Sequence, residues 1–308
     1  MCGTRGPNRA AAFPPPLVRA FRLSGFHAFT HPRAPAGRET PGRGEPPERV
    51  PAIAAIANLK GGTAKTTTVA NLAVAVGEAG GRVLAIDLDG STHALTRAFG
   101  YAPSATPATV LEVMSGEVEL ADAIATDAAR GVDLLAARRE LAALELSLVA
   151  ELGRERVLSR ALSDRLTPYD AVLMDCPPSL SLLTVNALFA ADDVLIPVSL
   201  QDAGALQGAA ELAGAIKRAQ AAGATASIRA CVRVKADERR IASRAIDQAL
   251  AELGLPIARS GVPLTAAFDT AVARGRPLML SQPDSRGAWA YRHLASELEL
   301  VPRLAAAA

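Results

Sequence analysis

A glycine- and lysine-rich segment at residues 58–68 carries the clearest chemistry in the sequence. It reads NLKGGTAKTTT. Glycines let backbone N–H groups turn toward an anion, and a lysine at this offset can reach the β- and γ-phosphates of a nucleotide. A hydroxyl directly after that lysine can ligate Mg²⁺. We therefore predict a phosphate loop in which Lys65 contacts phosphate and Thr66 binds the metal, made of Lys60, Gly61, Gly62, Thr63, Ala64, Lys65, Thr66 and Thr67.

Two further segments place a carboxylate directly after an apolar run. VLAIDLD ends at Asp89, and YDAVLMDCPPSLSLLTVNAL, at residues 169–188, contains Asp175 after its apolar stretch. We expect Asp175 to reach the shell of the magnesium ion, usually through water, because Mg²⁺ gives up its hydration reluctantly. Cys176 follows it, and nothing nearby would make it a thiolate, so we interpret it as a small core residue.

Predicted strands and helices, which would position these residues, alternate from residue 52 onward. Apolar runs predict strands at 53–57, 83–86, 132–135, 171–174, 194–198 and 228–234. Helical stretches are predicted at 65–79, 138–149, 153–166, 179–190, 203–221, 238–253 and 285–299. This alternation predicts an α/β fold with a doubly wound, mostly parallel sheet and no second domain. Ligands of such sheets bind at the carboxyl ends of the strands, where the segments above fall.

The loop resembles the KGGxxK[ST]T motif of the deviant Walker-A P-loop ATPases, most closely the ParA/Soj group of partition ATPases. That resemblance implies ATP and Mg²⁺ as cofactors and an ATP-dependent homodimer. It also implies that Lys60 acts catalytically by reaching the partner's nucleotide, as an arginine finger does. The usual motif has glycine where this chain has Ala64.

The resemblance runs from about residue 53 to residue 299 and assigns further roles. Asp89 falls in a segment similar to LLIDLDPQGN and is implied to position the attacking water. Here the continuation is Gly-Ser-Thr-His at 90–93 instead of Pro-Gln-Gly-Asn. We expect this difference to affect the rate of hydrolysis more than nucleotide binding. Residues 169–188 match the family's Walker B segment nearly residue by residue. Pro263 falls where a proline helps to hold adenine.

Family resemblance implies a partition ATPase whose ATP dimer binds DNA non-specifically and meets a ParB-like, centromere-bound partner. It would be cytoplasmic and nucleoid-associated. The alternative is a MinD-like positioning ATPase on a membrane, which needs a basic amphipathic C-terminal helix. The end of this chain has one cation and a proline after residue 297, so we expect no membrane partner. Candidate DNA contacts are Lys217, Arg218, Arg229, Arg233, Lys235, Arg239, Arg240, Arg244, Arg274 and Arg276.

Residues 1–49 differ in composition from the predicted ATPase domain at 50–308. They hold nine prolines and eight arginines against three glutamates, and they show no sustained period, so we expect disorder. Three interpretations stay open: a basic tail, a transit peptide, or upstream sequence translated from a wrongly assigned start, with the real protein beginning near Val50. Without this leader the net charge is −3, so net charge gives no support for nucleic-acid binding. Three cysteines without metal-ligand or disulfide spacing favour a reducing compartment.

Overall fold

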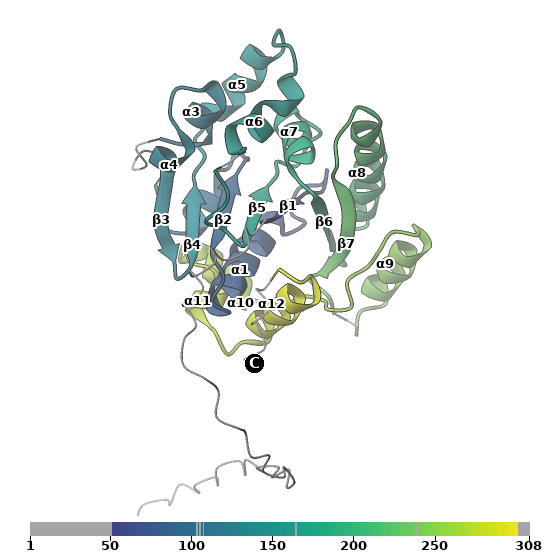
Figure 1. Cartoon of the computed structure of the whole chain (residues 1–308). Coiled ribbons are helices and arrows are strands. Elements are labelled where there is room, and N and C mark those ends of the chain that lie inside the picture. Colours follow the sequence, from purple (N-terminus) through teal and green to yellow (C-terminus); the bar gives the residue numbers. More distant parts are fainter. Residues whose placement is uncertain are drawn as a thin grey trace, which may run out of the picture. The chain divides into compact units, whose positions relative to one another are not determined.

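A seven-stranded sheet forms the centre of the computed structural model, which describes residues 51–300 apart from Pro103, Ala105, Pro107, Asp164 and Glu238 (Figure 1). The predictions for residues 1–49 and for the last eight residues lie outside the described residues. The order across the sheet is β3-β4-β2-β5-β1-β6-β7. The strands are β1 (Ala52–Ile56), β2 (Val83–Asp87), β3 (Ile124–Ala129), β4 (Val132–Leu135), β5 (Ala171–Asp175), β6 (Asp193–Ser199) and β7 (Ser227–Val234).

Six of these strands are parallel, which confirms the predicted doubly wound α/β class. β1 lies between β5 and β6, and β2 lies on the other side of β5. Because both faces of a parallel sheet are covered, its strands are continuous apolar runs, and every residue of β2 and β5 is buried. The pairing aligns Ile56 with Asp175 and Asp87 with Asp175, so the three strand ends meet at one edge.

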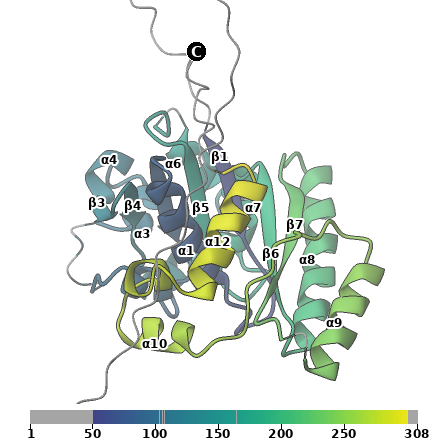
Figure 2. The same ribbon diagram turned by 90° about the horizontal axis from the view of Figure 1, so that it is seen from below.

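Helices cover both faces of the sheet and separate two apolar cores. One face carries α1 (Lys65–Glu78), α11 (Leu278–Ser281) and α12 (Arg286–Glu297), and Figure 2 shows α1 and α12 side by side across it. The other face carries the remaining helices that pack on the core: α3 (Val110–Ser115), α4 (Leu120–Ala123), α5 (Leu141–Leu148), α6 (Val157–Leu162), α7 (Leu182–Ala190), α8 (Gly204–Ala221) and α9 (Ile241–Glu252). Two short helices, α2 (Ala94–Ala98) and α10 (Ala267–Ala273), lie in the connections near the carboxyl edge.

The prediction of six strands was wrong by one, because β3 pairs antiparallel with β4 at the edge of the sheet. Its sequence, IATDAA, is half exposed, and Asp127 interrupts it with a positive φ of 56° where the register shifts. An edge strand of this kind lacks the apolar run that marks the buried strands. The helices predicted at 138–149 and 153–166 are also shorter than expected, at 141–148 and 157–162.

No helix in the described part of the chain is long and apolar enough to cross a membrane.

Candidate nucleotide-binding site

The predicted phosphate loop connects the end of β1 at Ile56 to the start of α1 at Lys65. Gly62 and Ala64 both have left-handed backbones, with φ of 75° and 62°. At Ala64 the usual glycine would adopt this conformation freely, whereas an alanine pays about 1–2 kcal/mol. No side chain caps the N-terminus of α1 and its first turn holds no acidic residue. Its first N–H groups and the helix dipole therefore suit an anionic ligand.

Lys65 folds back over this loop, where its Nζ donates to the carbonyl oxygen of Lys60 at 3.1 Å. The side chain is largely buried. Burial lowers the pKa of Lys65, and the nearby Asp175 carboxylate partly offsets that effect. Thr63, also buried, donates from its hydroxyl to the same carbonyl at 3.2 Å. The loop thus holds an ammonium group at the mouth of the helix, where phosphate oxygens would accept from it.

Thr66, in the first turn of α1, contacts Asp175 at the end of β5, the strand beside β1 in the sheet. The Thr66 hydroxyl donates to Asp175 Oδ2 at 2.6 Å, while Asp175 Oδ1 is buried without a hydrogen-bond partner among the described residues. Burial raises the pKa of Asp175 well above its usual range, and Asp87 on the neighbouring strand raises it further. A buried, unpartnered carboxylate oxygen calls for a missing partner. A hydrated divalent cation fits this pair of oxygen donors.

Asp89, which follows β2, has both carboxylate oxygens engaged by Ser91 and Thr92, two and three positions further on. Oδ1 accepts from the Ser91 N–H at 3.1 Å, the Ser91 hydroxyl at 2.5 Å and the Thr92 N–H at 3.3 Å. Oδ2 accepts from the Thr92 hydroxyl at 2.8 Å. These hydroxyls belong to the Gly-Ser-Thr-His stretch that departs from the family pattern. The departure therefore gives Asp89 two local partners.

Asp87 supports this turn from within the core. It is completely buried and accepts from the Asp89 N–H at 3.0 Å and from the N–H and hydroxyl of Thr96 at 2.9 and 2.8 Å. Burial raises the pKa of Asp87 to about 6, although the bonds from Thr96 work against that shift. The side chain therefore ties the start of the Asp89 turn to α2.

A cavity of about 940 Å³ lies beside the loop and brings distant predicted residues together. Its wall includes residues 61–67, Asp89 and Pro263. Pro263 reaches it because the segment after α9 pairs with the end of β7: Ala236 N–H donates to Val262 O and Leu264 N–H donates to Ala236 O. Leu264 and Phe268 make this part of the wall apolar, as a purine base requires.

Lys60, unlike the rest of the loop, does not line the cavity. Its side chain is half exposed, and its Nζ lies 3.8 Å from Asp202 Oδ2, just before α8.

Two residues at the site were not predicted there. Lys235, a candidate DNA contact, lines the cavity, and its Nζ donates to Gly62 O at 2.9 Å. Asn58 lies buried beneath the loop, and its Oδ1 accepts from the Lys60 N–H at 3.0 Å. The Lys235 contact leaves no signal in sequence spacing, because it joins residues 173 positions apart, whereas the bond from Lys60 to Asn58 is local. Cys176 is a buried core residue as predicted, and burial raises the pKa of its thiol.

Comparison with known proteins agrees with this arrangement. A family described as "AAA domain" matches residues 51–228. Soj, the sporulation initiation inhibitor of Bacillus subtilis, is 33% identical over 248 residues, covering 80% of this chain and 97% of Soj. The chromosome partitioning protein ParA of Caulobacter vibrioides is 34% identical, covering 80% of this chain and 93% of ParA. The chain belongs to the ParA/Soj family of partition ATPases. The resemblance found in the sequence is thereby confirmed.

Solved structures of related proteins share the fold of this ParA/Soj chain, and two of them hold a nucleotide with magnesium. A Mycobacterium smegmatis structure described as cobyrinic acid a,c-diamide synthase with an ATP analogue and magnesium is 36% identical, with a TM-score of 0.70. It covers 80% of this chain and 93% of that one. MinD from Pyrococcus horikoshii with Mg-ADP is 26% identical, with a TM-score of 0.68 and coverage of 81% and 96%. The P-loop fold class is therefore shared across these proteins.

Proposed function

We propose that this ParA/Soj chain binds Mg·ATP in the cavity beside its phosphate loop and hydrolyses it to ADP and phosphate. The observation that carries the proposal is the Thr66–Asp175 contact with the unpartnered Asp175 Oδ1 beside it. A magnesium ion there would neutralise charge on the β- and γ-phosphates. Related structures that hold an ATP analogue or ADP with magnesium support this assignment.

Each predicted residue has a role in this proposal. Lys65 and the N–H groups of residues 61–67 bind phosphate, Thr66 and Asp175 hold the metal, and Pro263 contacts the adenine. Asp89 orients the attacking water. Lys60 points away from its own cavity and so suits a role in trans, in which each protomer supplies a cation to its partner's nucleotide.

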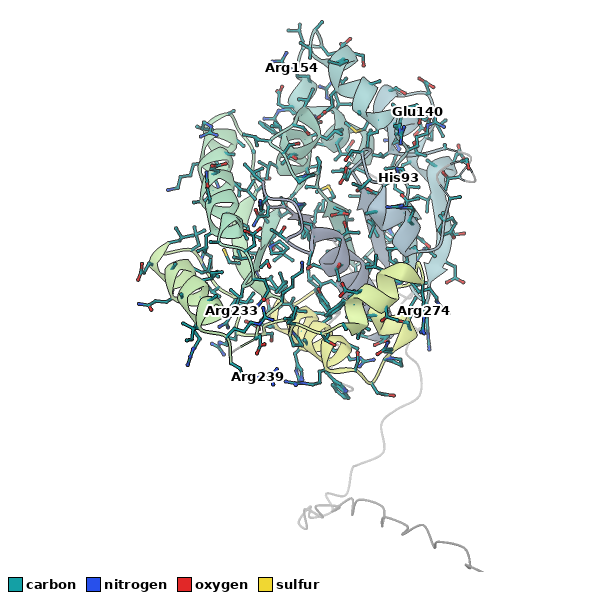
Figure 3. The ribbon with its side chains drawn as sticks, turned by 180° about the vertical axis from the view of Figure 1, so that it is seen from behind. His93, Glu140, Arg154, Arg233, Arg239 and Arg274 are labelled. Carbon is teal, nitrogen blue, oxygen red and sulfur yellow. The ribbon has the colours of Figure 1, made fainter. Side chains whose placement is uncertain are left out.

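The biological activity that we propose is ATP-dependent, sequence-independent DNA binding that moves a plasmid or chromosome, with a ParB-like partner stimulating hydrolysis. Figure 3 shows Arg233, Arg239 and Arg274, which come from different segments, along one edge of the molecule. Several candidate cations there are already paired: Arg233 with Asp247, and Arg239 and Arg240 with Asp237. Phosphates would compete with these exposed pairs, which are individually weak.

A mobility shift on plain DNA with ATP, with ADP and without nucleotide tests this function. We expect a shift that needs ATP and weakens steeply with salt, because each phosphate contact releases counterions. A shift indifferent to nucleotide and salt would contradict the proposal. The same protein mixed with anionic lipid vesicles tests the MinD-like alternative, for which the likeness to MinD structures is the supporting observation. ATP-dependent co-sedimentation with vesicles but not with DNA would favour that alternative.

A further inference from the structure

The start of the phosphate loop is fastened to helix α8 by one buried side chain. Asn58 is fully buried, and its Nδ2 donates to Pro197 O at 2.9 Å and to Ala205 O at 3.1 Å. Its Oδ1 accepts from the Lys60 N–H at 3.0 Å. A single amide thus joins strand β6, the first turn of α8 and the backbone of Lys60.

Helix α8 has a glycine, Gly208, at the point where the Asn58 amide packs against it. A Cβ atom added at Gly208 would overlap Asn58 Oδ1 and would lie 2.9 Å from Lys60 N and 3.1 Å from Lys60 Cβ. A Cβ at Gly204, one turn earlier, would lie 3.1 Å from Asp202 Oδ1 and 3.2 Å from Lys60 Cε. Glycine costs a helix interior about 1 kcal/mol relative to alanine. Close approach of the loop backbone accounts for glycine at position 208, whereas at Gly204 a Cβ would press only on side-chain atoms of Asp202 and Lys60.

Gly214 offers the internal comparison, because it lies in the same helix but away from the loop. A Cβ there would meet only Arg218 Nη1, at 3.6 Å, which is an ordinary contact. The restriction to glycine in α8 is therefore local to the turns that face Asn58 and Lys60.

We propose that Asn58 and Gly208 are positioning residues for Lys60, so that α8 sets the placement of the trans lysine while α1 and β5 set the phosphate and metal groups. Lys65 and Thr66 begin α1, and Thr66 contacts Asp175 at the end of β5. Lys60 instead meets α8 through its backbone, its Cβ and its Cε. The inference rests on the proposed role of Lys60 in the ATP dimer.

The decisive experiment compares Gly208→Ala with Gly214→Ala in the full chain. Three quantities are measured: ADP affinity of the isolated chain, ATP-dependent dimer formation by light scattering, and kcat and KM for ATP. For Gly208→Ala we expect ADP affinity and KM within about threefold of wild type, with dimer formation and kcat reduced at least tenfold. Gly214→Ala should match wild type in all three. Equal behaviour of the two variants, or a loss of ADP affinity as large as the loss of kcat, would overturn the proposal.

Gly204→Ala decides the matter if Gly208→Ala does not fold. Its Cβ would press only on the side-chain atoms of Asp202 and Lys60, so the fold should survive. We expect an intermediate loss of dimer and of kcat, with ADP affinity retained. If Gly204→Ala behaved like Gly214→Ala, the packing of Lys60 against α8 would have no influence on the function of Lys60, and the proposal would fail.

Two further variants separate this inference from the proposed function and test whether Asn58 and Gly208 act through the same contact. If Lys60→Ala leaves dimer and turnover unchanged, the trans role itself is wrong, whatever Gly208→Ala does. If Lys60→Ala abolishes both and Gly208→Ala abolishes neither, only the positioning inference is wrong. Asn58→Ala combined with Gly208→Ala should lose no more than the larger single variant, since both act through one contact. Additive losses would contradict that shared mechanism.

Discussion

Thr92 restrains the carboxylate to which we assign the orientation of the attacking water. Its hydroxyl donates to Asp89 Oδ2 at 2.8 Å, while the other three bonds to Asp89 go to Oδ1. Thr92→Ala therefore frees one carboxylate oxygen and leaves the backbone turn in place. If Asp89 must release Oδ2 to accept a hydrogen bond from the attacking water, removing this bond lowers the barrier to hydrolysis.

The size of the effect follows from the strength of that bond. A hydrogen bond to a charged group contributes about 1.5–3 kcal/mol when protected from water. Thr92 is exposed to water, so the contribution falls below that range, at about 1 kcal/mol. Because about 1.4 kcal/mol corresponds to a factor of ten in rate, we expect kcat to rise about fivefold. KM should change little, because residues 61–67 and the apolar wall at Pro263, Leu264 and Phe268 are unchanged.

Steady-state phosphate release at saturating Mg·ATP measures this directly. Thr92→Ser is the matched control, since it keeps the hydroxyl and should keep the wild-type kcat. Asp89→Ala should remove most turnover in either background. A kcat for Thr92→Ala equal to or below that of wild type, with Thr92→Ser unchanged, would show that the hydroxyl does not hold Asp89 back.

Three other outcomes are expected. Lys65→Ala should abolish nucleotide binding, measured with a fluorescent ATP analogue, and unchanged affinity would refute the loop assignment. The raised pKa of Asp87, about 6, means that its contribution to stability is complete below about pH 4 and is lost as pH rises through 6. In denaturant titrations the unfolding free energy of Asp87→Asn, measured relative to wild type, should therefore rise by up to about 3 kcal/mol as pH goes from 4 to 7, because only the wild type loses stability on ionising. A chain shortened to residues 50–308 should retain the full-length ATP affinity and kcat, and a tenfold loss of either would give the leader a role.

The sequence predicts those parts of the structure that follow from local pattern. The six parallel strands are continuous apolar runs because both faces are buried, so each could be located within a few residues. Edge strand β3 could not, because its half-exposed IATDAA has neither an apolar run nor clean alternation. Short helices such as α2 and α10 span too few residues to establish a 3.6-residue period.

Much the same division applies to the candidate site. The phosphate loop, Asp89 and Asp175 are visible in the sequence, since each follows directly from its own strand and needs no knowledge of its neighbours. Contacts such as Lys235 with Gly62 O, or Asn58 with α8, join residues more than 100 positions apart. Their partners are set by the order β1-β6-β7 across the sheet, and strand order is not encoded in any local spacing.

Departures from the family pattern occur at two places in the site, at Ala64 in the phosphate loop and at residues 90–93 beside Asp89. Lys65, Thr66 and Asp175, which would hold phosphate and metal, match the family pattern. Thr66 and Asp175 are already in contact. The altered residues at 90–93 instead supply two hydroxyls that bind the carboxylate of Asp89. A chain built in this way should bind ATP as its relatives do and hydrolyse it more slowly. In the proposed cycle hydrolysis ends the ATP dimer, so slow turnover would lengthen the time for which the proposed dimer remains on DNA.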